Sequence, residues 1–312
     1  MNLNVVAIQE LMWTYHPLPK DWKVVPFDDK DSIKKADVLV QSNQAGSKKE
    51  KKIGHIYEFV KNSSKPWIVT ESAVFRKNMK QPPDPGAYHR YSWFSYFRDE
   101  GNYNNKNCPP DRWYQIQKEQ NIEIKPWRKK GEYVLLVLQR PGDSSLKRLI
   151  SQYGNYDNFI NATIANIQKN TNRPIVIRMH PLRQDKQKNL INAYQEYSDK
   201  KNITISENTQ GAKLLEGGDG LYKDFEDAYC VVGFNSNALT ESICEGIPTF
   251  SLCPSSMAWE CSNTDLSFLD NPQTFNRHQW LSNLGYCQWR EDECLEGLPA
   301  RHLLNIYNTI RI

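Results

Sequence analysis

Several common features are missing from this sequence, and their absence removes whole classes of function. No stretch approaches the ~20 apolar residues that a membrane-spanning helix needs. The first residues lack the basic segment and apolar run of a secretory signal peptide, so we expect a cytoplasmic protein with no membrane partner. Neither a Gly-x-Gly-x-x-Gly nor a Walker sequence occurs, which disfavours dinucleotide-binding and P-loop chemistry.

Cysteine is present, but not in the spacing of a metal site. The 7 cysteines form no Cys-x-x-Cys pair and the 6 histidines are dispersed, so we predict no bound metal. An odd number of cysteines cannot all pair within one chain. We therefore expect reduced, mostly buried thiols at positions 108, 230, 244, 253, 261, 287 and 294.

Length and charge suggest two parts with different tasks. A chain of 312 residues exceeds one ordinary domain of roughly 100–200 residues, so we expect two domains and a cleft. Residues 1–130 hold 23 Lys+Arg against 15 Asp+Glu, a net of +8, whereas residues 131–312 hold 17 against 21, a net of −4. This split suggests that the first part binds a polyanion, with a solvated lysine-rich surface as the alternative.

From about residue 132 the sequence alternates between strand and helix patterns. Continuous apolar runs at 133–138 and 174–179 are typical of strands buried on both faces of a parallel sheet. The remaining pattern predicts strands at 203–205, 229–232 and 248–252, and helices at 158–168, 186–198, 221–228 and 237–245. Such alternation predicts βαβ units in a doubly wound parallel sheet, where ligands bind beyond the carboxyl ends of the strands.

The first 130 residues are less regular but fit a smaller α/β domain. Their pattern predicts strands at 5–8, 24–25, 37–40 and 67–70 and a helix at 52–61, while 81–130 reads as long loops or a linker. We predict an N-terminal domain at 1–130 and a C-terminal domain at 131–290. We also predict a C-terminal helix at 291–312, which could pack back on the N-terminal domain.

The segment from Gly233 to Glu241 joins a buried strand to a helix through a turn rich in Asn and Ser. Backbone N–H groups and the positive end of the helix dipole favour a diphosphate there. The side chains of Asn235, Ser236 and Asn237 add donors, and Glu241 could accept ribose hydroxyls. An ordinary helix N-cap explains the same residues equally well.

Polar residues at two other strand ends favour a phosphate site. Arg140 ends the first strand of the regular region, in a Gly-Ser loop that includes Asp143 and Ser144, and a guanidinium suits bidentate phosphate contacts. Arg178 and His180 flank the end of the second strand, where the imidazole could donate to a phosphate or a base. Three strand ends therefore offer phosphate-binding side chains to one crevice.

These motifs carry a family resemblance. The segments Leu-Gln-Arg-Pro-Gly-Asp-Ser-Ser, Ile-Arg-Met-His-Pro, Gly-Phe-Asn-Ser-Asn-Ala-Leu-Thr-Glu and Ala-Trp-Glu-Cys-Ser-Asn-Thr-Asp-Leu resemble a glycosyltransferase family of tailed bacteriophages. More distantly, they are similar to the donor domain of GT-B enzymes, including capsule-type sugar transferases. The similarity covers most of residues 95–290. It implies two Rossmann-like domains facing a cleft, with the N-terminal domain at 1–130 binding the acceptor and the C-terminal domain at 131–290 binding a nucleoside-diphosphate sugar such as a UDP-sugar. It implies no required cofactor.

The resemblance also implies an acceptor. Phage members of this kind are associated with glycosylation of hydroxymethylated pyrimidines in DNA, which would suit a basic first domain, since Lys and Arg contacts to phosphates supply most sequence-independent DNA affinity. The lysine cluster 48–52 and the aromatic, basic segment 88–98 are the candidate surfaces. Packing inside the domain is the alternative for the second. The named acceptor-binding candidates are Ser42, Asn43, Arg90, Trp93 and Arg98.

An inverting transferase needs a general base for the acceptor hydroxyl. Glu71, directly after a predicted strand, and Glu100, in an Asn-rich loop, are the first candidates, with Asp99 as a third. A retaining mechanism would not need this base. Transfer to a surface polysaccharide or lipid-linked acceptor, a nucleotide-sugar epimerase and a non-catalytic nucleotide- or glycan-binding module stay open as alternatives.

Overall fold

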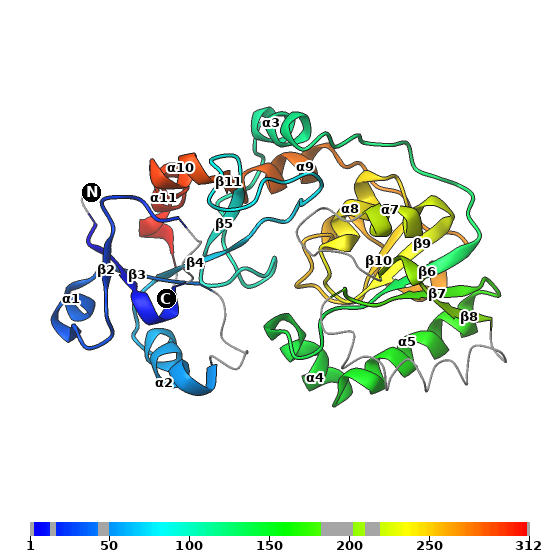
Figure 1. Cartoon of the computed structure of the whole chain (residues 1–312), viewed down its shortest axis with the longest axis horizontal. Helices are drawn as coiled ribbons and strands as arrows, with labels where there is room; N and C mark the ends of the chain where they lie inside the picture. Colours follow the sequence, from blue (N-terminus) through cyan, green and yellow to red (C-terminus); the bar gives the residue numbers. More distant parts are fainter. Residues whose placement is uncertain (1–2, 13–16, 43–49, 182–201, 210–218, 311–312) are drawn as a thin grey trace. The chain divides into compact units, whose positions relative to one another are not determined.

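The computed structural model describes residues 3–12, 17–42, 50–181, 202–209 and 219–310 (Figure 1). The helix predicted at 186–198, Asn43 and the side chains of the lysine cluster 48–52 lie outside the described residues. The chain forms two compact units, which we describe separately. Unit 1 comprises residues 1–74, 79–119 and 281–312, and unit 2 comprises 75–78 and 120–280.

Unit 2 contains a five-stranded parallel sheet in the order β10-β9-β6-β7-β8. Its strands are β6 (Tyr133–Val137), β7 (Ile175–Arg178), β8 (Ile203–Ile205), β9 (Ala228–Gly233) and β10 (Thr249–Ser251). Helices cover it on both faces, so the predicted doubly wound parallel sheet is confirmed (Figure 1). These helices are α4 (Lys147–Tyr153), α5 (Tyr156–Asn170), α7 (Asp219–Glu226) and α8 (Ala238–Cys244). A further helix, α9 (His278–Gly285), begins in unit 2 and lies mostly in unit 1.

Apolar periodicity explains why α5 packs on this sheet. Phe159, Ile160, Ile164 and Ile167 recur at helical spacing, and all four are buried against alternate residues of the strands. Asn155 caps the helix, accepting the N–H of Asn158 at 2.8 Å. The predicted helix at 158–168 therefore exists and begins two residues earlier.

Unit 1 contains a six-stranded sheet in the order β11-β5-β4-β3-β1-β2. Its strands are β1 (Val5–Ile8), β2 (Lys23–Val25), β3 (Val38–Ser42), β4 (Trp67–Ser72), β5 (Tyr88–Trp93) and β11 (Gln288–Arg290). The first four are parallel, β5 is antiparallel to β4, and β11 is antiparallel to β5. Its helices are α1 (Lys30–Lys35), α2 (Glu50–Lys61), α3 (Asp111–Glu119), α10 (Glu291–Leu295) and α11 (Leu298–Leu304).

The prediction of loops or a linker over 81–130 is wrong for β5 (88–93) and α3 (111–119), whereas the rest of this segment contains no helix or strand. All six residues of β5 are buried although half of them are polar. Their polar atoms find partners far along the chain: His89 Nε2 lies 2.7 Å from Glu291 and Arg90 Nε donates to the Ser72 carbonyl at 2.6 Å. Burial lowers the pKa of His89 to about 4, so the ring is neutral near pH 7.

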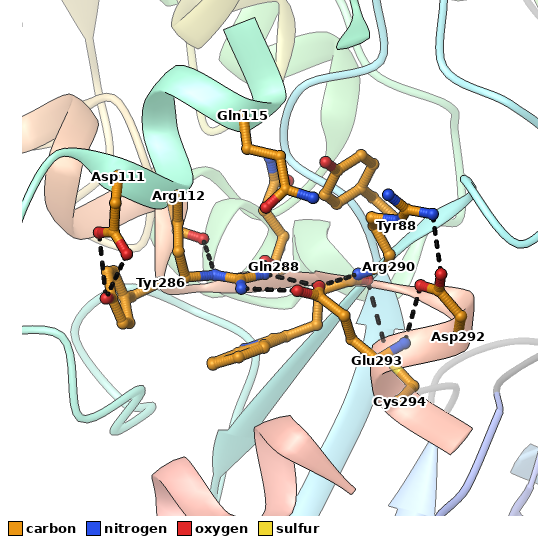
Figure 2. A network of polar contacts seen from close by, with 12 residues as sticks. Tyr88, Asp111, Arg112, Gln115, Tyr286, Gln288, Arg290, Asp292, Glu293 and Cys294 are labelled. Carbon is orange, nitrogen blue, oxygen red and sulfur yellow. Dashed lines mark hydrogen bonds and ion pairs between the residues drawn. The ribbon is translucent and has the colours of Figure 1, made fainter. Parts of the chain in front are cut away.

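A buried ion pair connects α3 to the C-terminal segment (Figure 2). The Arg112 guanidinium donates to both carboxylate oxygens of Glu293 at 2.8 Å, and also to the Gln288 carbonyl at 3.0 Å. It lies 3.8 Å from the centre of the Trp289 ring. Burial raises the pKa of Glu293, but the hydrogen bonds and charge of Arg112 outweigh this and lower that pKa below 4.5. Residues 281–312 are thereby fixed in unit 1.

We expect Arg112→Met to lower the free energy of unfolding by about 3–5 kcal/mol, because it leaves the Glu293 carboxylate buried without its partner. Urea unfolding at pH 7 measures the loss. The difference from wild type should shrink as pH falls, because burial without Arg112 raises the pKa of Glu293 in the variant and its unpaired charge is protonated first. Wild type then loses its ion pair as pH falls through its own lowered pKa. Arg301→Met is the control, because Arg301 is exposed and bonds only a helix-end carbonyl nearby. Equal effects of the two substitutions would contradict the assignment.

Candidate active site

The candidate site lies at the carboxyl ends of β6 and β9, the two central strands of the unit 2 sheet. In chain order the strands are arranged 5-4-1-2-3, so the connections from β6 and β9 leave in opposite directions. Such a switch point leaves room for a ligand between the two loops. The register pairs Val137 with Gly233, so the loops 138–143 and 234–237 begin side by side.

Asn235 joins these two loops. Its amide nitrogen donates to the Ser145 carbonyl at 3.2 Å and to Ser255 Oγ at 2.8 Å, and its backbone N–H donates to Gln139 Oε1 at 3.3 Å. Gln139 in turn donates to Ser145 Oγ at 3.0 Å. The amide oxygen of Asn235 is buried and has no partner among the described residues. An unpaired buried acceptor costs about 1–3 kcal/mol, which a ligand donor would recover.

The other predicted residues of these loops have mixed roles. Arg140, Ser144 and Asn237 are half-buried at the switch point. The Asp143 carboxylate accepts the Ser145 N–H at 2.9 Å and so caps the short 3₁₀ helix that follows. Ser236 Oγ accepts the Ala238 N–H at 3.3 Å, whereas Asn237, the N-cap residue of α8, makes no side-chain cap hydrogen bond. The capping alternative for this segment is therefore supported at Ser236 but not at Asn237.

At the end of β7 the structure gives Arg178 a structural contact. Arg178 is buried, forms an ion pair with the buried Asp224 and donates to the Gly220 carbonyl at 3.0 Å. Asp224 also accepts hydrogen bonds from Ser206 Oγ. This pair attaches α7 to β7 and commits the guanidinium that we expected to contact a donor. His180, two residues later, is half-buried.

Glu241 lies in the first turn of α8 and is surrounded by residues that the sequence analysis did not identify. Tyr222 donates to its carboxylate at 3.3 Å, and the Arg76 backbone N–H also hydrogen-bonds it. Burial raises the pKa of Glu241 to about 6 despite the positive charges of Arg76 and Lys77. The segment 75–78 thus belongs to unit 2 although unit 1 flanks it in sequence. No local pattern predicts that.

Three predicted acceptor residues of unit 1 are buried with internal partners. Trp93 is 0% exposed and donates to the Leu303 carbonyl at 3.1 Å, so its ring is not available to stack on a base. Arg90 is committed to the Ser72 carbonyl. The Ser42 hydroxyl donates to the Leu11 carbonyl at 2.7 Å. Packing inside the domain, the alternative for the aromatic segment 88–98, therefore accounts for Arg90 and Trp93. Arg98 in the same segment is half-buried.

The three candidate bases of unit 1 lie near different ends of β4. Glu71 is opposite Arg90, near the carboxyl end of the strand. Glu100 and Asp99 are exposed in the loop after Trp93, which pairs with Ile68 at the other end. Glu100 accepts a hydrogen bond from Ser95 Oγ at 3.2 Å. Among the three, Glu71 is therefore the one at the carboxyl edge, where α/β sheets bind ligands.

The described residues contain no metal site and no membrane-spanning helix. Among them, no group of three or more His, Cys, Asp or Glu side chains could hold a metal ion. No described helix has the length and apolar character needed to cross a membrane. All seven cysteines are free and buried, as expected from their number and spacing.

Comparison with known proteins identifies the fold. No family model matches the sequence, and no curated protein matches it. The chain is similar to the solved beta Kdo 2,4 transferase of Thermosulfurimonas dismutans KpsC, with 11% identity, a TM-score of 0.55 and 93% of each chain covered. The beta Kdo 2,7 transferase of that KpsC gives 13% identity and a TM-score of 0.48, covering 97% of this chain and 99% of the other.

A Methanocaldococcus jannaschii UDP-GlcNAc 2-epimerase is more distant, with 14% identity, a TM-score of 0.34 and coverage of 82% and 76% of the two chains. The fold assignment rests on the first of these structures. At 11% identity the similarity shows the fold alone, which is a GT-B-like fold with two Rossmann-like sheets. The predicted fold class is therefore confirmed.

The raised pKa of Glu241 predicts a cost of ionisation in the folded protein. A folded-state pKa of about 6 against 4.5 corresponds to about 2 kcal/mol of stability that is present below pH 4.5 and lost as pH rises through 6. Glu241→Gln has no carboxyl group to ionise and should not lose this stability. Its free energy of unfolding relative to wild type should therefore rise by about 2 kcal/mol between pH 4.5 and 7.5. Urea unfolding at both pH values measures this. The exposed Glu132→Gln is the control, and parallel behaviour of both variants would contradict the prediction.

Proposed function

We propose that this protein is a glycosyltransferase that takes its sugar from a nucleoside-diphosphate sugar bound at the carboxyl ends of β6 and β9. The observation that carries the proposal is the buried, unpaired amide oxygen of Asn235 at the switch point. A diphosphate has no donor for this oxygen, but a sugar or ribose hydroxyl does. A nucleotide sugar supplies both groups in one molecule.

The surrounding side chains fit the two parts of such a donor. Arg140 and Ser144 provide a guanidinium and a hydroxyl suited to the phosphates, with Asn237 at the start of α8. Glu241 is ionised above about pH 6 and can then accept ribose hydroxyls. The similar solved structure is, by its name, a sugar transferase, which supports this chemistry on this fold. A UDP-sugar is the donor to test first.

For an inverting reaction we propose Glu71 as the general base. Removal of the acceptor proton by a positioned carboxylate contributes typically 10²–10⁴-fold to the rate. The location of Glu71 near the carboxyl end of β4 supports this choice, because Glu100 and Asp99 follow the far end of the neighbouring strand.

The acceptor that we favour is a hydroxyl of a carbohydrate chain. Counted over the compact units, unit 1 holds 20 Lys+Arg against 18 Asp+Glu and unit 2 also holds 20 against 18, a net of +2 for each. The net charge of +8 for residues 1–130 arises because a cut at residue 130 does not follow the boundaries of the folded units. The segment 88–98 is mostly buried or half-buried as well. Hydroxymethylpyrimidine DNA, which the phage-family resemblance implies, is the second candidate.

Mass spectrometry can test donor and acceptor together. The purified protein is incubated with a panel of nucleoside-diphosphate sugars, first alone and then with oligosaccharides or hydroxymethylated duplex DNA. We expect a mass increase of one sugar on an oligosaccharide. Transfer to DNA would select the second candidate. Conversion of a donor incubated alone into an isomer of equal mass, separated by chromatography before detection, would show an epimerase. Absence of donor binding and turnover would exclude the glycosyltransferase proposal.

Glu71→Gln should lower kcat for transfer by about 10²–10⁴-fold with little change in donor affinity, because the amide cannot accept the acceptor proton. Glu100→Gln is the matched control and should keep near wild-type kcat. Steady-state kinetics and donor titration measure the two effects. Full activity of Glu71→Gln with loss in Glu100→Gln would reverse the assignment, and full activity in both would favour a retaining mechanism.

A further inference from the structure

A second cavity in unit 2 lies between α7, the end of α8 and the segments 77–78 and 125–128. Its volume is about 620 Å³, within the 300–1,000 Å³ typical of small-molecule sites. Charged side chains dominate the lining: Lys77, Lys125, Arg128, Lys223, Glu226 and Glu245. The aromatic residues Tyr222 and Phe225 complete one wall.

This cavity borders the proposed donor site, because its wall residue Tyr222 hydrogen-bonds Glu241, but it extends from there toward the other end of α8. The donor site lies at the N-terminal end of α8, whereas Glu245 directly follows its last residue, Cys244. A rise of 1.5 Å per residue places these two ends about 10 Å apart along the helix. Phe225 and Glu226 likewise end α7, just before β9 begins at Ala228. The cavity therefore extends toward the amino edge of the sheet, away from the switch point.

Two arginines donate hydrogen bonds to backbone carbonyls at the C-terminal ends of α7 and α8, so these carbonyls do not need the lysines as partners. Arg128 donates to the carbonyls of Phe225, Glu226 and Ala228 at 2.5, 2.9 and 2.8 Å, which satisfies the C-terminal end of α7. Arg277 donates to the Ile243 carbonyl of α8 at 2.7 Å. Three lysines then line the cavity against two carboxylates.

The lysines are arranged with an excess of positive charge. Lys77 and Lys125 both contact Glu245, at 3.1 and 2.5 Å, although one carboxylate balances only one of them. The Lys125 side chain remains 45% exposed, and Lys223 is also exposed. Each ammonium group carries three donors, so both can bind an incoming anion without losing their present contacts.

We propose that this cavity is a second ligand site, which binds a phosphate-bearing small molecule independently of the donor site. The phosphoryl oxygens contact the ammonium groups of Lys125 and Lys223. The rest of the molecule packs along Tyr222 and Phe225. The site does not depend on the proposed glycosyl transfer, because none of its contacts uses the switch-point loops.

Lysine acetylation followed by peptide mass spectrometry can test this site in the full chain. Pyrophosphate is the probe, with sodium chloride at matched ionic strength as the reference. We expect acetylation of Lys125 and Lys223 to slow at least about threefold, since a bound phosphate covers their ammonium groups. Lys147, which follows the Ser144–Ser145 loop, reports on the donor site, and the exposed Lys169 of α5 is the control.

Each outcome decides the proposal. Slowing at Lys125 and Lys223 with no change at Lys169 supports the second site. Slowing at Lys147 alone would place pyrophosphate only at the donor site, which overturns this proposal and leaves the proposed function intact. Equal slowing at all four lysines would be an ionic effect and would also overturn it.

Equilibrium dialysis with labelled pyrophosphate provides an independent measurement. The double substitution Lys125→Gln, Lys223→Gln should reduce the number of pyrophosphate molecules bound per chain by one, because it keeps polar side chains but removes the two ammonium charges. Lys169→Gln should remove none. Equal binding by the double variant and wild type would reject the site.

Discussion

The buried pair between Arg112 and Glu293 is the interaction on which the division of the chain depends. It attaches residues 281–312 to unit 1, although the chain reaches them only after completing unit 2. The pair holds β11 beside β5, which gives the first sheet its sixth strand, and α10 begins directly afterwards (Figure 2). Buried ion pairs contribute little net stability compared with apolar packing, but their geometry is specific. Here that specificity selects where the end of the chain packs.

This return of the chain also changes the electrostatic argument about function. The C-terminal segment brings four acidic residues at positions 291, 292, 293 and 296 into unit 1, while the basic stretch around 125–130 belongs to unit 2. Both units consequently carry the same small net charge. Net charge governs nonspecific attraction to polyanions, and it must be counted over the folded unit that would meet the ligand. The reason to prefer a nucleic acid acceptor therefore weakens without any change in the sequence.

Sequence patterns predicted the second sheet well because its strands are apolar runs separated by amphipathic helices such as α5. They failed at β5, where His89 and Arg90 interrupt the apolar pattern and are satisfied by Glu291 and the Ser72 carbonyl. Long-range partners of this kind leave no local signal. The same limit applies to the site: Asn235 lies in a recognisable turn, but its bond to Ser255 required the fold.

The segment 75–78 shows how the candidate site depends on tertiary structure. Arg76 contributes its backbone N–H and positive charge to Glu241, and Lys77 lies 4.5 Å above the ring of Tyr222, which itself hydrogen-bonds that carboxylate. Without these groups burial would raise the pKa of Glu241 further and keep it protonated near neutral pH. A protonated carboxyl has less capacity to accept ribose hydroxyls. The crossing segment therefore limits the rise that burial causes in the pKa of Glu241, so the half-buried carboxylate is ionised at neutral pH and can accept hydroxyl hydrogen bonds.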